Sequence, residues 1–157
     1  MLIVEDHAPM REAMRVLIER SFPGLSVIEA PDGATALKVV EAHEPSFVLM
    51  DINLPDAHGL DLMRDILKQW PDTFVAAISM DTSADLPERV RAAGALDFIG
   101  KDKLFTTLLP LVGAAVTMTN WRKDLESHSA ITDESPLYGG HHAEHFLKTD
   151  VLRVGQD

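Results

Sequence analysis

The chain has 157 residues with 46% hydrophobic content, and 25 acidic residues against 14 basic ones give a net charge of −11. This length and apolar content predict one domain with its own core. The acidic balance argues against direct DNA binding, which normally needs a basic surface. The chain has no cysteine, so disulfides and thiolate metal sites are excluded.

No continuous apolar run approaches the roughly 18 residues that a membrane span needs. The first residues also lack the basic start and small-residue cleavage pattern of a secretory signal. We therefore expect a cytoplasmic protein with no membrane partner.

Short apolar runs alternate with amphipathic segments along the first 118 residues. A continuous apolar run bounded by turn residues is typical of a strand buried in a parallel sheet, and apolar residues at i, i+3, i+4 and i+7 indicate a helix. The predicted strands lie at 1–6, 25–30, 46–51, 74–78 and 96–99. The predicted helices lie between His7 and Phe22, after Gly33, at 59–70, around 86–93 and at 104–118.

Pro110 affects where the last helix is expected to begin. Proline is tolerated in the first turn of a helix, whose N–H groups have no internal partner, and disfavoured further in. We therefore expect this helix to begin near Thr106 or Thr107, with a threonine as its N-cap.

The remaining segment, 119–157, is predicted to be a tail that is partly helical or disordered. Residues 119–129 can extend the last helix. His141, His142 and His145 have a spacing that a transition metal can use. A solvated or partner-bound tail is the favoured interpretation of these histidines, because no flanking carboxylate pattern supports a metal site.

Five strands that alternate with helices predict an α/β fold of βαβ units with a parallel sheet. In such sheets ligands bind outside the carboxyl ends of the strands. Asp51 stands where the third apolar run stops. From that stretch alone Asp51 is either a turn residue that caps the next helix or a chemical group, since aspartate is common at such junctions.

Polar residues at the ends of the other strands decide between these two interpretations. Glu5 and Asp6 follow the first strand, Ser79 ends the fourth and Lys101 follows the fifth. Carboxylates brought together at one sheet edge repel each other unless a cation intervenes, and Mg²⁺ prefers oxygen ligands of this kind. A lysine and a hydroxyl beside them make chemical sense as ligands of an anion, such as a phosphoryl group on Asp51.

These motifs resemble the CheY-like receiver domain of two-component response regulators. The matching segments are the acidic pair 5–6 after an apolar run, 50–56 with Gly59, Ser79 after 76–78, and 93–101. They keep their order and spacing over 1–118. The resemblance implies a flavodoxin-like (βα)5 fold with strand order 2-1-3-4-5 and helices on both faces.

The resemblance also implies roles for individual residues. Asp51 would accept a phosphoryl group from a sensor histidine kinase or a phosphotransfer protein. Asp6 and Asp51 would bind Mg²⁺ directly, Asn53 through its main-chain carbonyl and Glu5 through water. Ser79 and Lys101 would contact the phosphoryl oxygens.

Phe98 would be the aromatic residue whose rotamer reports phosphorylation. The face formed by the fourth helix, fifth strand and fifth helix would then change and act on a downstream protein target. A homodimer through this face or through the tail is a further expectation.

Departures from the family pattern include Glu5, in place of the commoner aspartate, and Met80, where a small residue is usual. Met80 is expected to crowd the phosphoryl site and slow the access of small donors. Asp102 follows Lys101 where many receivers have proline, which we treat as a minor change.

Two other functions are open to a chain with these residues. A degenerate receiver would act as a docking module without phosphorylation, although the intact Asp51, Asp6 and Lys101 argue against it. A haloacid-dehalogenase-like phosphatase also uses an aspartyl phosphate and Mg²⁺, but it requires Asp-x-Asp and Asn53 stands at the second position. We expect no enzyme activity beyond self-phosphorylation from small donors and autodephosphorylation.

Overall fold

The computed structural model describes residues 1–129 of the chain. The chain divides into two compact units, Met1–Arg122, which contains the whole sheet, and Lys123–Asp157, of which only 123–129 are described. His141, His142 and His145 lie outside the described residues, so the expectation of a solvated or partner-bound tail stays a prediction.

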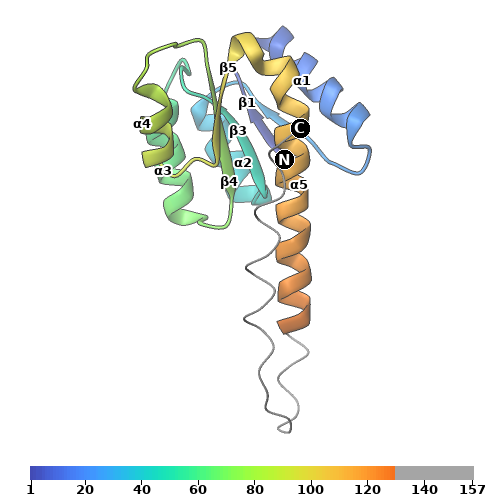
Figure 1. The fold of residues 1–157 in the computed structure, drawn as a ribbon. Helices are drawn as coiled ribbons and strands as arrows, with labels where there is room; N and C mark the ends of the chain where they lie inside the picture. Colours follow the sequence, from blue (N-terminus) through green and yellow to red (C-terminus); the bar gives the residue numbers. More distant parts are fainter. Residues whose placement is uncertain (130–157) are drawn as a thin grey trace, which may run out of the picture. The chain divides into compact units, whose positions relative to one another are not determined.

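A five-stranded parallel sheet forms the centre of the first unit (Figure 1). Its strands stand in the order β2-β1-β3-β4-β5, which confirms the predicted flavodoxin-like topology. The strands are β1 (Leu2–Val4), β2 (Ile28–Ala30), β3 (Phe47–Asp51), β4 (Phe74–Ser79) and β5 (Asp97–Gly100). The helices are α1 (Ala8–Ser21), α2 (Gly33–His43), α3 (Gly59–Gln69), α4 (Leu86–Ala92) and α5 (Leu104–Ser129).

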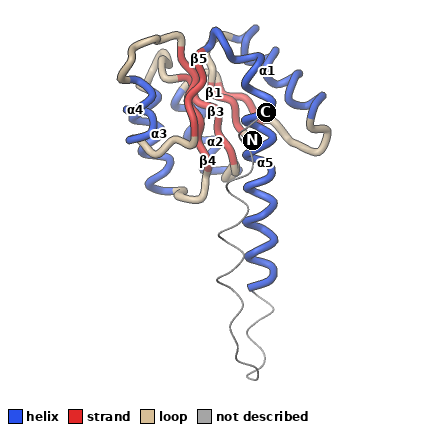
Figure 2. The backbone as a smooth tube through the Cα atoms, viewed as in Figure 1, coloured by secondary structure: helices blue, strands red, loops and turns tan. Residues whose placement is uncertain are grey.

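The helices cover the sheet on both faces, as the tube view shows (Figure 2). Side chains of α2, α3 and α4 share one hydrophobic cluster, and those of α1 and α5 share the other. Successive residues of a strand point to opposite faces, so Val48 joins the first cluster while Leu49 joins the second. Every residue of β3 is buried, which explains why its sequence is a continuous apolar run.

The start of α5 differs from the prediction. The helix begins at Leu104 and contains Pro110 in its interior, and no threonine caps it. Leu104 and Leu108 are fully buried, and each such side chain contributes about 1.5–3 kcal/mol on burial, which offsets the loss at the proline. Pro110 has no N–H to donate to the carbonyl group of Thr106, four residues earlier. Thr106 and Pro110 are both exposed, so water can reach this end of the turn.

The end of α5 confirms the extension that the sequence left open over 119–129. Arg122, the last residue of the first unit, makes two contacts within that unit. Its Nη1 donates to the carbonyl oxygen of Asp72 at 2.5 Å, and its guanidinium lies 4.7 Å from the centroid of the Phe74 ring. A cation over an aromatic face is attracted by the ring quadrupole. Both contacts therefore hold α5, as far as Arg122, near the start of β4.

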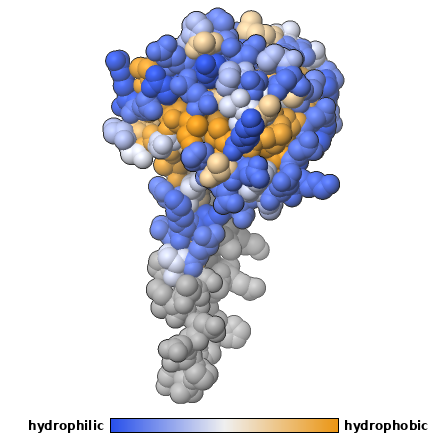
Figure 3. All heavy atoms as spheres, turned by 180° about the vertical axis from the view of Figure 1, so that it is seen from behind, coloured by the Kyte–Doolittle hydropathy of each residue, from blue (hydrophilic) through white to orange (hydrophobic). Residues whose placement is uncertain are grey.

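Among the described residues, one helix, Lys101–Ser127, is long and apolar enough to cross a membrane by length and composition. Leu104, Leu108 and Val112 on this helix are fully buried against the sheet. The first half of this helix therefore belongs to the core of the domain. Seen from behind, the described surface is mostly hydrophilic around an apolar band (Figure 3), as the acidic composition predicts.

Gly59 lets α3 begin directly against the end of β3. Its N–H donates to the carbonyl oxygen of Ile52 at 2.7 Å. A Cβ atom at this position would lie 2.6 Å from the Cα atom of Ile52 and closer still to the carbonyl oxygen of Asp51. Only glycine fits here without moving the backbone that carries Asp51.

We therefore expect Gly59→Ala to lower the free energy of unfolding by about 3 kcal/mol, since overpacking against backbone cannot relax by a rotamer change. Urea denaturation would measure this loss. Gly24→Ala is the matched control, because no atom lies within 4 Å of the Cβ position at Gly24. Equal stability of the two variants would contradict the steric explanation.

Candidate functional site

The parallel register brings the predicted site residues to one edge of the sheet. Val4 pairs with Met50, Asp51 pairs with Ile78, and Ser79 pairs with Gly100. The residues that follow or end these strands therefore meet beyond their carboxyl ends. They are Glu5, Asp6, Asp51, Ser79 and Lys101.

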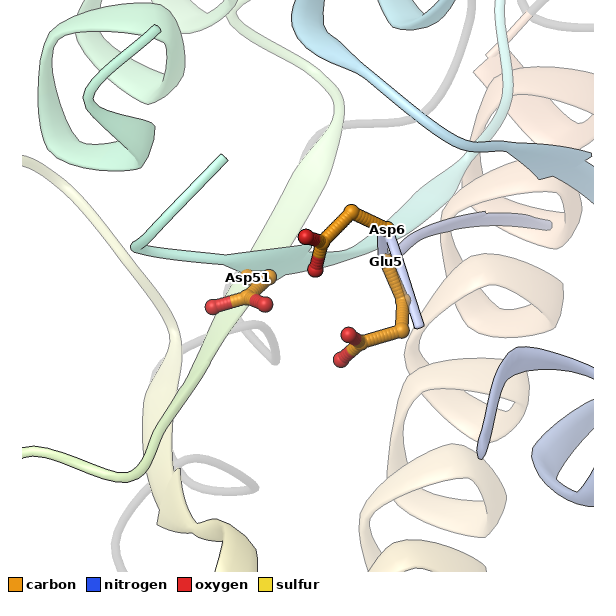
Figure 4. A group of neighbouring side chains, drawn as sticks. All are labelled: Glu5, Asp6 and Asp51. Atoms are coloured by element: carbon orange, nitrogen blue, oxygen red, sulfur yellow. The ribbon is translucent and has the colours of Figure 1, made fainter. Parts of the chain in front are cut away.

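Three carboxylates form the centre of this edge, and they point toward a common space (Figure 4). One oxygen of each of Glu5, Asp6 and Asp51 lies within 4.8 Å of the others. Glu5 is fully buried and Asp51 is 2% exposed, whereas Asp6 is exposed. The like charges raise the energy of the cluster unless a cation compensates them.

Lys101 supplies one compensating charge. Its Nζ lies 2.7 Å from Oε2 of Glu5 and 2.8 Å from Oδ2 of Asp51, and its side chain is 9% exposed. Burial acts to lower the pKa of Lys101, but the close contacts of its ammonium group with the Asp51 and Glu5 carboxylates outweigh it and raise the pKa above its usual value. Lys101 is therefore held as an ammonium ion between two carboxylates.

Burial raises the pKa of Glu5 above its usual value, and the charge of Asp51 adds to this effect. Lys101 and the main-chain N–H of His7, which donates to Oε1 at 3.0 Å, act in the opposite direction. Oε2 is buried and, despite its ion pair with Lys101, has no well-directed hydrogen bond among the described residues.

Asp51 is oriented through both of its carboxylate oxygens. Oδ2 accepts a hydrogen bond from Lys101, and Oδ1 accepts one from the main-chain N–H of Asn53 at 3.0 Å. Asn53 in turn pairs with His58 across the loop between β3 and α3. The carboxylate therefore stands in a fixed orientation at the end of a fully buried strand.

The other predicted residues lie around this centre. Ser79 is 1% exposed, and its Oγ accepts a hydrogen bond from the N–H of Asp81 at 3.0 Å. Met80 is 68% exposed directly after it. Phe98 is half-buried and packs against the cluster beneath α3 and α4. The roles given to these three residues stay predictions.

The donor set fits a hard divalent cation such as Mg²⁺. Three carboxylates face one ammonium group, and a buried carboxylate oxygen lacks a well-directed hydrogen bond. Asp6 and Asn53 also line an open cleft of about 370 Å³, so an ion can approach the cluster from the side of Asp6. Mg²⁺ typically binds through one or two carboxylates and keeps several waters.

The comparisons with known proteins agree with this geometry. Residues 1–112 match the response regulator receiver domain, so the chain belongs to that family. The transcriptional regulatory protein PdtaR of Mycobacterium tuberculosis is 30% identical over 134 residues, which is 85% of this chain and 64% of that protein. The chain spans between 43% and 64% of the length of three curated relatives that it matches.

Solved receiver structures show the same fold. A LuxR-family two-component response regulator from Aurantimonas has a TM-score of 0.68 and 28% identity, covering 74% of this chain and 83% of that one. The BeF3-activated receiver domain of Klebsiella pneumoniae RstA has a TM-score of 0.67 and 25% identity, covering 73% and 95%.

Two residues that the sequence analysis did not single out hold the loops of the site. Arg11 on α1 donates through Nη1 to the carbonyl oxygen of Glu5 at 2.7 Å, and its Nε lies 3.2 Å from Oε1 of Glu29. Asp56 joins the loop after β3 to the start of α2. No local pattern signals either contact, because the partners that matter are distant in the sequence.

Replacing Lys101 with alanine should lower the free energy of unfolding by about 3 kcal/mol near neutral pH, because removing one partner leaves buried charges unpaired. Without Lys101, the remaining effects on Glu5 raise its pKa further. The folded state then binds protons more tightly than the unfolded state, so the stability of the variant increases as the pH falls from about 7 toward 5.

Urea denaturation at the two pH values would measure both effects. Lys103→Ala is the matched control, because Lys103 is exposed in the same turn and has no ion pair with these carboxylates. A Lys101 variant as stable as this control at neutral pH would show that the ion pairs do not compensate the acidic cluster.

Proposed function

We propose that this chain is a phosphoacceptor response regulator of a two-component system, located in the cytoplasm. Asp51 accepts a phosphoryl group from a sensor histidine kinase or a phosphotransfer protein. The observation that most supports this proposal is the pairing of the buried Asp51 carboxylate with Lys101 at 2.8 Å, beside Glu5 and Asp6. The family membership supports the same function.

The proposed reaction transfers the phosphoryl group between two side chains. An oxygen of Asp51 attacks the phosphorus of a phosphohistidine on the donor. The P–N bond breaks, its electron pair stays on the imidazole nitrogen, and an aspartyl phosphate remains on Asp51. The receiver thus undergoes covalent modification, with no activity toward a separate substrate.

Each neighbour of Asp51 has a part in this proposal. Lys101 pairs with the charge of the phosphoryl oxygens, and the Ser79 hydroxyl donates a hydrogen bond to one of them. Asp6, Asp51 and the main-chain carbonyl of Asn53 would hold Mg²⁺, with Glu5 acting through a water molecule. When bound, the ion neutralises charge on the transferring group.

The proposed output passes through the face formed by α4, β5 and α5. Phe98 on β5 is half-buried and packs against the cluster beneath α3 and α4, and in this proposal its side chain changes rotamer on phosphorylation. Movement of Ser79 toward the phosphoryl group would favour the inward rotamer. The changed face would then contact a downstream protein or a second copy of the chain.

Incubation of the full chain with Mg²⁺ and acetyl phosphate is expected to phosphorylate Asp51, and beryllofluoride is expected to bind at the same place. Asp51→Asn should abolish labelling, since the attacking carboxylate oxygen is lost. Intact-mass and peptide mass spectrometry would measure this. Asp61→Asn is the control, because Asp61 is an exposed residue of α3. Equal labelling of the Asp51 variant would refute the assignment.

Met80→Ala should raise the rate of phosphorylation by acetyl phosphate several-fold. The Met80 side chain is 68% exposed next to Ser79, where it can obstruct the approach of a small donor. Time courses of labelling would measure the rate. Met118→Ala removes another exposed methionine, on α5, and should leave it unchanged. An unchanged rate for the Met80 variant would rule out crowding by this side chain.

A further inference from the structure

Asp56 connects the loop after β3 to a helix of a different βα unit. Its Oδ1 accepts a hydrogen bond from the main-chain N–H of Gly33 at 2.8 Å, and its Oδ2 accepts one from that of Ala34 at 2.9 Å. Both donors belong to the first turn of α2, whose N–H groups have no partner within the helix. A carboxylate at this end of a helix is also favoured by the helix dipole.

The loop that Asp56 anchors is the one that begins at Asp51. It closes on itself through the bridge between Asn53 and His58 and through the hydrogen bond from Gly59 to Ile52. Its first residues also orient Asp51, because the N–H of Asn53 donates to Oδ1. Within the described residues, the hydrogen bonds of Asp56 connect the loop 53–58 to α2, which lies on the other side of β3 in the sequence.

The loop packs closely against the start of α2, which leaves no room for a side chain at Gly33 without a shift of its neighbours. A Cβ atom at Gly33 would lie 3.0 Å from Cβ of Ala57 and 3.2 Å from Oδ1 of Asp56. The start of α2 therefore approaches the loop closely, and Gly33 permits that approach. The two hydrogen bonds and this contact together fix the loop against α2.

We propose that Asp56 is a positioning residue for the chemistry at Asp51. By fixing the loop on α2, it holds Asn53, whose N–H orients the Asp51 carboxylate and whose carbonyl group is the expected main-chain ligand of the metal. This inference deepens the proposed function and rests on it. It distinguishes Asp56 from an ordinary helix cap, because a cap stabilises its helix without changing the site.

The structure supplies a matched control for this distinction. Asp32 is the N-cap of the same helix, and its Oδ1 accepts a hydrogen bond from the N–H of Thr35 at 2.7 Å. Asp32→Ala therefore removes a carboxylate cap from α2 and leaves the tether to the loop intact. Asp56→Ala removes the tether, and Asp56→Asn keeps one acceptor oxygen with which to restore part of it.

The test measures Mg²⁺ affinity by isothermal titration calorimetry on the full chain, together with thermal unfolding and the rate of Asp51 labelling by acetyl phosphate. Asp56→Ala should raise the Kd for Mg²⁺ about 10-fold, the lower end for residues that orient metal ligands. Asp56→Asn should show a smaller rise. Asp32→Ala should lower thermal stability and leave the Kd and the labelling rate unchanged.

An unchanged Kd for Asp56→Ala would overturn the inference, as would an equal rise in Asp56→Ala and Asp32→Ala. If Asp56→Ala fails to fold, the comparison of Asp56→Asn with Asp32→Ala decides in the same way. Wild-type protein that binds Mg²⁺ but is never labelled would refute the proposed function instead, and the Mg²⁺ affinities would still decide whether Asp56 positions the site.

Discussion

The ion pairs of Lys101 with Glu5 and Asp51 are the interaction on which this edge of the protein depends. Parallel strands bring their carboxyl ends together, so the sheet that buries the core also gathers three carboxylates in one place. Two of these are almost fully buried, and charges in such positions are tolerated only when they are paired. One ammonium group at 2.7 and 2.8 Å makes the arrangement possible.

This compensation is incomplete. One positive charge faces three acids, and burial still leaves the pKa of Glu5 above its usual value. A site with excess negative charge and oxygen ligands attracts a divalent cation, and the same lysine attracts an anion. The incomplete charge compensation at this edge is therefore consistent with the phosphoryl transfer to Asp51 that we propose.

The fold could be predicted from the sequence because its main signals are local. The run that forms β3 is apolar at consecutive positions, and the helices show apolar residues at helical spacing. The meeting of Asp51 and Lys101 could also be predicted, since parallel topology alone brings strand ends together. Both features follow from patterns that a single sequence contains.

Other features depended on contacts that no local pattern encodes. The predicted start of α5 was wrong. Burial of Leu104 and Leu108 in the assembled core outweighs the cost of a proline inside the helix. The anchors Arg11 and Asp56 were missed for a related reason. The Asp56 carboxylate meets main-chain groups more than twenty residues earlier, and any residue type except proline would offer the same N–H there.

The longer side chain at position 5 explains why Glu5 and Asp6 make different contacts. One more methylene than aspartate lets Glu5 reach Lys101 with Oε2 while Oε1 accepts from the N–H of His7. Asp6, which makes neither contact, is exposed and lines the open cleft with Asn53. Glu5 therefore neutralises the lysine from inside the protein. Of the three acids, Asp6 is the one that solvent-borne ions can reach directly, an arrangement consistent with the proposed metal site, in which Glu5 acts only through water.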